Sequence, residues 1–68
     1  MLSKNIKEHR KRLGWSQQKL AEKSGLSYNA ITKLEQGSVK QPTVQTIRKI
    51  ADAFHISIDK LIGRKITN

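Results

Sequence analysis

Cysteine is absent from this sequence, and aromatic residues and carboxylates are scarce. Without a thiol the chain has neither a disulfide framework nor a thiolate metal site, and its two histidines alone do not form a zinc site. We therefore expect no metal and no cofactor. Apolar residues never run long enough to span a bilayer, and no apolar segment of signal-peptide type follows the basic start. These absences favour a cytoplasmic protein with no membrane partner.

The shortage of acidic residues leaves a strongly basic chain. Five Asp and Glu accompany fourteen Lys and Arg, which gives a formal net charge of +9. Such a surface attracts polyanions, although a basic protein that is merely soluble is the plainer alternative. The acids are scattered, no Ser/His/Asp set can be argued, and no GxxxxGK phosphate loop is present. We expect a protein that is not an enzyme.

Helix signals recur along the 68 residues, which are enough for one small domain. Hydroxyl residues before apolar segments predict N-caps at Ser16, Ser27, Thr43 and Ser57, with Ser3 as a weaker candidate. Glycines predict helix ends at Gly14, Gly25, Gly37 and Gly63. We predict an all-α domain over residues 1–68, with a core at about 4–63 and a loose tail at 64–68. Its helices are expected near 3–13, 17–24, 28–36, 44–54 and 58–62.

Each predicted helix has an apolar side when residues are spaced at about 100°. The expected core residues are Leu2, Ile6, His9 and Leu13 in the first helix, Leu20 and Ala21 in the second, Val44, Ile47, Ile50, Ala51 and Phe54 in the fourth, and Ile58, Leu61 and Ile62 in the last. His9 is expected to be a half-buried core histidine rather than a ligand, and Trp15 a lid over the core.

The helix predicted over 28–36 has an unusual polar side. Its outer arc holds Tyr28, Asn29, Thr32, Lys33 and Gln36, and its inner arc holds Ser27, Ala30, Ile31 and Leu34. Glu35 falls between the arcs. A solvated face normally includes carboxylates, whereas this one offers only hydroxyl, amide and ammonium groups. Such groups read base edges and grip phosphates: Asn suits adenine, Lys suits guanine, and Tyr can donate to phosphate or lie against a thymine methyl. A polar face by chance is the alternative.

The segment "QQKLAEKSGLSYNAITKLEQ" resembles a helix-turn-helix of the Cro/CI-type (XRE-like) phage-repressor family. The resemblance rests on the A-x-x-x-G turn, the "LEQG" ending, the Pro-Thr helix start and the "ISIDKLIGR" ending, and it runs from about residue 4 to 63. It implies a compact five-helix lambda-repressor-like DNA-binding domain, with a helix-turn-helix formed by helices two and three.

The resemblance also implies roles for individual residues. The base-contacting residues would be Tyr28, Asn29, Thr32 and Lys33. The contacts to the DNA backbone would come from Ser16, Gln17, Ser27, Gln36, Lys40, Gln41 and Thr43. A structural ion pair would join Arg10 and Glu35. Many relatives have Gln in place of Tyr28 and Asn29, so their operators cannot be transferred. His55 stands where many have a capping Gly, and since His tolerates a positive φ we expect it to cap the helix over 44–54.

These observations predict a sequence-specific regulator of transcription, most simply a repressor, that inserts helix 28–36 into the major groove of double-stranded DNA. A single module covers few base pairs, so we expect a homodimer on a palindromic operator, with an interface of Ile58, Leu61, Ile62 and Ile66. No small-molecule ligand is evident. Two alternatives remain: an antitoxin-like protein-interaction module, and a general polyanion binder that attaches to RNA or anionic membranes through charge.

Overall fold

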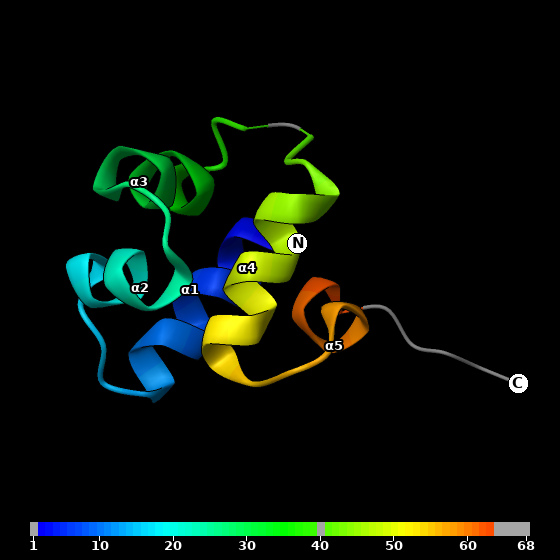
Figure 1. The fold of residues 1–68 in the computed structure, drawn as a ribbon, viewed down its shortest axis with the longest axis horizontal. Helices are drawn as coiled ribbons and strands as arrows, with labels where there is room; N and C mark the ends of the chain where they lie inside the picture. Colours follow the sequence, from blue (N-terminus) through cyan, green and yellow to red (C-terminus); the bar gives the residue numbers. More distant parts are fainter. Residues whose placement is uncertain (1, 40, 64–68) are drawn as a thin grey trace, which may run out of the picture.

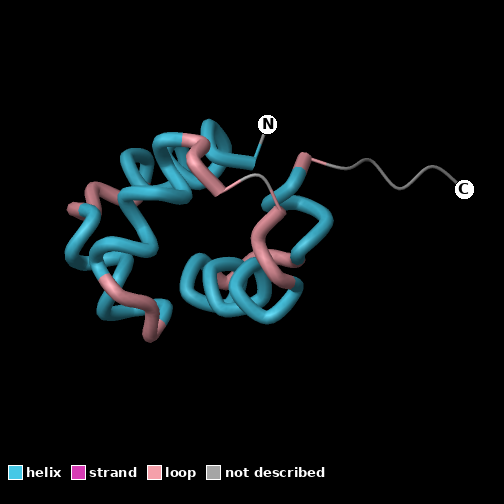
Figure 2. The backbone as a smooth tube through the Cα atoms, turned by 90° about the horizontal axis from the view of Figure 1, so that it is seen from above, coloured by secondary structure: helices cyan, strands magenta, loops and turns pink. Residues whose placement is uncertain are grey.

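The computed structural model describes residues 2–39 and 41–63. These residues form α1 (Leu2–Arg12), α2 (Gln17–Ser24), α3 (Tyr28–Gln36), α4 (Val44–Phe54) and α5 (Ile58–Ile62). The five predicted helices are therefore confirmed, with the last four at the expected bounds. Figure 2 shows helices and loops with no strand over the same residues. Within this described part, no helix has the length and apolar character needed to cross a membrane.

Hydroxyl side chains begin four of these helices as predicted. Each accepts a hydrogen bond from the backbone N–H three residues later, at 3.0–3.1 Å, and the four residues are Ser16, Ser27, Thr43 and Ser57. Such a bond satisfies one of the N–H groups that a helix start leaves unpaired. The weaker candidate, Ser3, was wrong, because α1 already begins at Leu2 and Ser3 lies inside its first turn.

Residues in the left-handed backbone conformation follow the helix ends. Gly37 has φ 77° after α3, a backbone conformation that residues with a Cβ rarely adopt. His55 has φ 59° and ψ 42° after α4, and its backbone N–H bonds to the last turn. The prediction that His55 caps α4 is confirmed.

The core takes one fully buried large side chain from every helix. These are Ile6, Leu20, Ile31, Ile50 and Leu61. Phe54 lies over them, with its ring centroid 5.0 Å from His9 and 5.7 Å from Trp15. Trp15 is partly buried against the core, as expected of a lid. Since the five helices share this one cluster, their relative positions are set by a single core.

Two residues depart from the expected core, and a third from the expected dimer surface. Leu13 is 46% exposed because α1 ends at Arg12, so the helical spacing no longer applies to it. Val44 is 66% exposed at the first residue of α4, whose buried residues lie in its second half, from Ile50 to Phe54. Leu61 is only 1% exposed, so it belongs to the core and its predicted place in a dimer surface was wrong.

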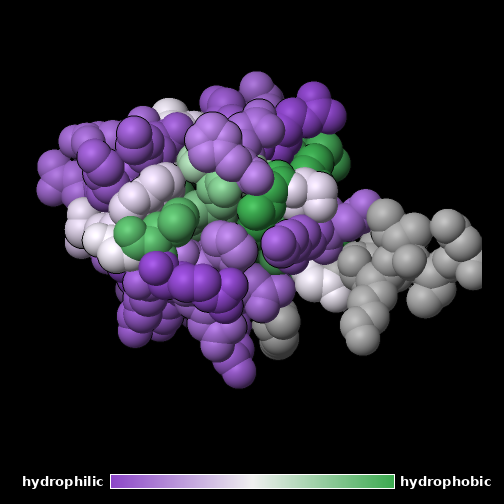
Figure 3. All heavy atoms as spheres, turned by 90° about the horizontal axis from the view of Figure 1, so that it is seen from below, coloured by the Kyte–Doolittle hydropathy of each residue, from purple (hydrophilic) through white to green (hydrophobic). Residues whose placement is uncertain are grey.

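The view from below shows hydrophobic atoms in the middle of a largely hydrophilic face (Figure 3).

The helices are arranged so that α3 lies at one side of the molecule. In Figure 1, α2 and α3 lie together at the left, α4 crosses in front of α1, and α5 lies at the right. Helix α3 packs against both α2 and α1, whereas α5 packs against α1 and α4. The arrangement supports α3 from within and leaves its outer side open to solvent.

Candidate nucleic-acid interface

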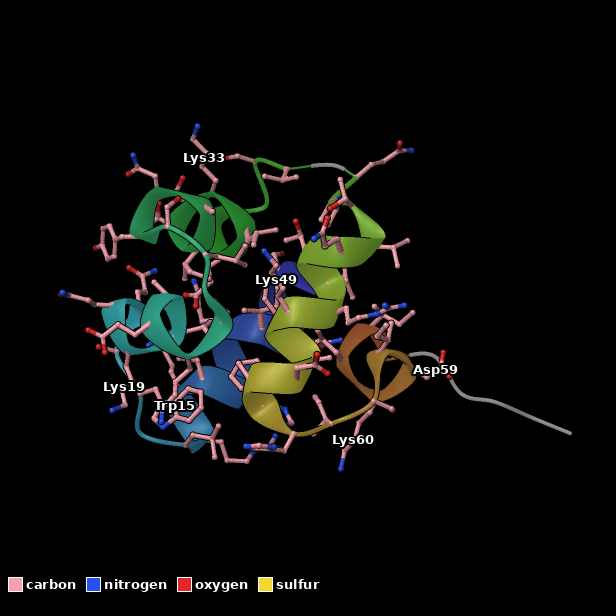
Figure 4. The ribbon with its side chains drawn as sticks, viewed as in Figure 1. Trp15, Lys19, Lys33, Lys49, Asp59 and Lys60 are labelled. Atoms are coloured by element: carbon pink, nitrogen blue, oxygen red, sulfur yellow. The ribbon has the colours of Figure 1, made fainter. Side chains whose placement is uncertain are left out.

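The outer side of α3 is polar and exposed. Tyr28 is 53% exposed, Asn29, Lys33 and Gln36 are exposed, and Thr32 is half-buried. Figure 4 shows Lys33 extending from α3 away from the other helices. The buried side of α3 consists of Ile31, Leu34 and Glu35. The structure thus brings the four predicted base-contacting residues to one surface that contains no exposed carboxylate from α3.

Ser27 does not belong to the buried arc of the helix. It is exposed, with extended backbone angles of φ −74° and ψ 157°, because it is the N-cap and precedes the helical spiral. Its hydroxyl oxygen accepts from the N–H of Ala30 at 3.1 Å. Ser27 therefore lies at the exposed start of α3, next to Tyr28.

Glu35 is buried and paired with Arg10. The Nε and Nη2 groups of Arg10 donate to the two carboxylate oxygens of Glu35, at 2.6 and 3.0 Å. A further guanidinium nitrogen, Nη1, donates to the backbone oxygen of Trp15 at 2.7 Å. The side chain of Arg10 is 11% exposed and that of Glu35 is 1% exposed, so removing either charge would leave the other buried without compensation. This ion pair connects α3 to α1.

Gln17, the first residue of α2, extends this network to the exposed surface. Its Nε2 donates to Glu35 Oε1 at 3.1 Å, and its Oε1 accepts from the hydroxyl of Tyr28 at 3.3 Å. The sequence did not predict this connection. The only signal was positional, since Gln17 and Tyr28 each open one helix of the predicted helix-turn-helix.

Several predicted backbone-contacting residues lie beside α3. A groove between α3 and the start of α4 is lined by Asn29, Lys33, Val39, Gln41, Pro42 and Thr43, among others. Ser16, Gln36, Gln41 and Thr43 are exposed, and Gln17 is half-buried. The hydroxyl of Thr43 donates to Thr46 Oγ1 at 3.0 Å. Lys40 and Ile66 lie outside the described residues, and Ile58 and Ile62 are half-buried on α5.

His9 lies away from this surface. Its ring packs against Phe54, and burial lowers the pKa of His9 below its ordinary value of 6.5, with smaller contributions from the charges of Arg12 and Lys60. A lowered pKa favours the neutral ring at physiological pH. The geometry agrees with the expected core histidine.

Comparison with known proteins places this geometry among DNA-binding regulators. The helix-turn-helix family matches the chain over residues 6–61. The transcriptional regulator SinR of Bacillus subtilis is 29% identical over 65 residues, which are 96% of this chain and 59% of SinR. The phage CTXphi transcriptional repressor RstR of Vibrio cholerae is 36% identical over 67 residues, which are 98% of this chain and 59% of RstR.

Two solved structures of SinR share the fold. The crystal structure of SinR in complex with DNA superposes with a TM-score of 0.85 at 29% identity, over 91% of this chain and 98% of that one. A chain of the complex between SinR and the SinI protein gives the same TM-score at 29% identity, over 91% of this chain and 60% of that one. The present chain thus spans 59% of the full length of SinR and 59% of that of RstR.

Proposed function

The chain belongs to the Cro/CI-type (XRE-like) helix-turn-helix family, and from this premise we propose that it is a sequence-specific DNA-binding regulator of transcription, most simply a repressor. The observation that carries the proposal is the exposed outer side of α3. It has hydroxyl, amide and ammonium groups and no exposed carboxylate, on a chain with a formal charge of +9. The complex of SinR with DNA supports it, because SinR shares the fold.

In this proposal α3 enters the major groove. Tyr28, Asn29, Thr32 and Lys33 are the residues that contact base edges. Asn29 is suited to a bidentate contact with adenine, and Lys33 to the O6 and N7 acceptors of guanine. The hydroxyl of Thr32 already donates to the backbone oxygen of Asn29 at 2.8 Å, which leaves its methyl group and its oxygen lone pairs for the DNA.

Contacts to the sugar-phosphate backbone would flank the recognition helix. The candidates are Ser16, Gln17, Ser27, Gln36, Lys40, Gln41 and Thr43. The exposed N-terminus of α2 supports this role, since backbone N–H groups at a helix start attract phosphate. Lysine and arginine side chains would add sequence-independent affinity by releasing counterions, and that part weakens as salt rises.

We further propose that the protein acts as a homodimer in the cytoplasm. Two copies would bind half-sites of a palindromic operator about one helical turn, or roughly 34 Å, apart. The half-buried Ile58 and Ile62 on α5 support this part of the proposal, since they combine partial exposure with an apolar side chain. Ile66, outside the described residues, stays a candidate from the sequence alone.

Selection of bound sequences from a random DNA pool tests the proposal at about 0.15 M salt, where contacts made by charge alone are weakened. We expect an enriched, two-fold symmetric site for the unaltered protein. Asn29→Ala should lose roughly 1–3 kcal/mol of discrimination at one or two positions and keep the rest of the site. If the Asn29→Ala protein bound every DNA sequence more weakly by the same factor, the assigned role of Asn29 would be contradicted.

The matched control is Lys7→Ala on α1, an exposed lysine outside the proposed base-contacting set. We expect a small, sequence-independent loss that shrinks as salt rises, with the selected site unchanged. A pool with no enriched sequence would count against the proposal. It would favour the second candidate, a protein-interaction module, which the SinR–SinI complex supports because one relative does bind another protein.

A further inference from the structure

A chain of hydrogen bonds leads from the buried ion pair to an exposed tyrosine on the proposed interface. Arg10 donates to Glu35, Gln17 connects Glu35 to Tyr28, and Tyr28 is 53% exposed. Each link has a donor and an acceptor, so the chain has a direction. That direction decides what the tyrosine can offer to a ligand.

Glu35 determines which group donates and which accepts in each of these bonds. Its carboxylate accepts N–H groups from Arg10 at both oxygens, and an ionised carboxylate has no hydrogen to donate. The side chain of Glu35 is 1% exposed and held by two bonds, so it cannot turn away from its neighbours. A side-chain amide facing this oxygen must present its NH₂ group. The Nε2 of Gln17 does so at 3.1 Å.

The orientation of Gln17 then fixes that of Tyr28. With its NH₂ group toward Glu35, Gln17 turns its carbonyl oxygen toward Tyr28, at 3.3 Å from the phenolic oxygen. A carbonyl oxygen only accepts, so the hydroxyl hydrogen of Tyr28 is used in this bond. What remains for a ligand is the lone-pair side of the phenolic oxygen.

We propose that Tyr28 acts as a hydrogen-bond acceptor in the major groove and selects an exocyclic amino group, either N6 of adenine or N4 of cytosine, on the strand that it faces. These are the donors of the major-groove edge, whereas guanine and thymine offer only acceptors there, besides the thymine methyl. Phosphate oxygens are acceptors too, so the hydroxyl is unsuited to phosphate while Gln17 holds it. The inference rests on the proposed function and specifies the chemistry of one of its contacts.

Gln17 is a positioning residue in this scheme. Its carbonyl orients the tyrosine, and its second amide hydrogen is free in the scheme to donate to a phosphate. Removing the carbonyl should release the hydroxyl hydrogen of Tyr28 and allow it to donate as well as accept. The base preference at one position would then widen from adenine or cytosine to all four bases.

Selection from a random DNA pool with three variants tests this prediction. We expect the unaltered protein to prefer adenine or cytosine at one position by roughly three- to tenfold, the range of one hydrogen bond. The Tyr28→Phe protein should lose that preference. The Gln17→Met protein should select guanine or thymine at that position as readily as adenine or cytosine. Gln18→Met, an exposed residue one position later, is the matched control and should select the same site as the unaltered protein.

A change of single atoms in the DNA tests the same contact without altering the protein. In the selected site, the preferred adenine is replaced by purine, or the preferred cytosine by pyrimidin-2-one, each of which lacks the exocyclic amino group. We expect a three- to tenfold loss of affinity for the unaltered protein and no loss for Tyr28→Phe. This measurement stays decisive if Gln17→Met fails to fold.

The outcomes separate this inference from the proposed function. An enriched site whose preference is unchanged in Tyr28→Phe would overturn the inference and leave the function standing. Equal losses on the amino-lacking DNA for the unaltered protein and Tyr28→Phe would do the same. A pool with no enriched sequence would overturn both.

Discussion

Glu35 is the acidic residue of α3, and the structure places it inside the protein rather than between the two arcs of the helix. The sequence spacing could not decide this, since the position of α1 relative to α3 depends on the whole core. Burying a carboxylate is unfavourable unless its charge is compensated, and the bidentate contact with Arg10 supplies the compensation.

Replacing the carboxylate by an amide should therefore destabilise the fold. Glu35→Gln keeps the shape but leaves the guanidinium of Arg10, in a side chain only 11% exposed, without a counter-charge. We expect a loss of roughly 3–5 kcal/mol in the free energy of unfolding, measured by urea titration followed by circular dichroism. Glu22→Gln, at an exposed position of α2, is the control and should stay within about 0.5 kcal/mol. Equal midpoints for the two variants would mean that the pair contributes nothing net.

Helix starts and ends were largely predictable because their signals are local. A serine hydroxyl reaches its own N3 amide, as Ser16 does to Lys19 at 3.0 Å, without help from the rest of the chain. The errors fell at helix ends, where helical spacing is a poor guide to burial: Leu13 lies just beyond the end of α1, and Val44 is the first residue of α4. The contact between Gln17 and Tyr28 joins the first residues of two helices, so it needs their relative placement, which no local signal contains.

His55 is an exposed non-glycine residue in the left-handed conformation that ends α4. Residues with a Cβ are strained in this conformation by about 1–2 kcal/mol, and His less than most. Glycine avoids the strain, but it loses more conformational entropy on folding, which offsets part of the gain. We expect His55→Gly to stabilise the protein by roughly 0.5–1 kcal/mol in thermal or urea unfolding. His55→Ala removes the same imidazole but keeps the strain, so it should not stabilise. Similar gains in both variants would assign the effect to the side chain instead.

At the scale of the whole molecule, positive charge and a small core act against each other. The formal charge is +9, and self-repulsion of this kind disfavours a compact state. The core that opposes it is one cluster shared by five helices, in which the ring of Phe54 packs against those of His9 and Trp15. The same excess of charge that would draw the protein to DNA therefore makes its stability sensitive to further protonation.

His9 is a group through which acid should destabilise the fold. It lies in a pocket with Glu8, Arg12 and Lys60, and burial followed by the charges of Arg12 and Lys60 lowers its pKa below 6.5. Because the folded state binds this proton less readily than the unfolded state, the contribution is fully present above about pH 6.5 and is lost as the pH falls through the lowered pKa.

Urea midpoints measured at about pH 7.5 and about pH 5, on either side of the ordinary histidine pKa, test this linkage. We expect the unaltered protein to lose more stability on acidification than His9→Leu. That variant has no imidazole to take up a proton beside the two basic side chains of Arg12 and Lys60. Gln18→Met, at an exposed position of α2 with no ionisable side chain, is the control and should keep the full acid sensitivity. If His9→Leu lost as much stability as the unaltered protein, the acid sensitivity would have to come from groups other than His9.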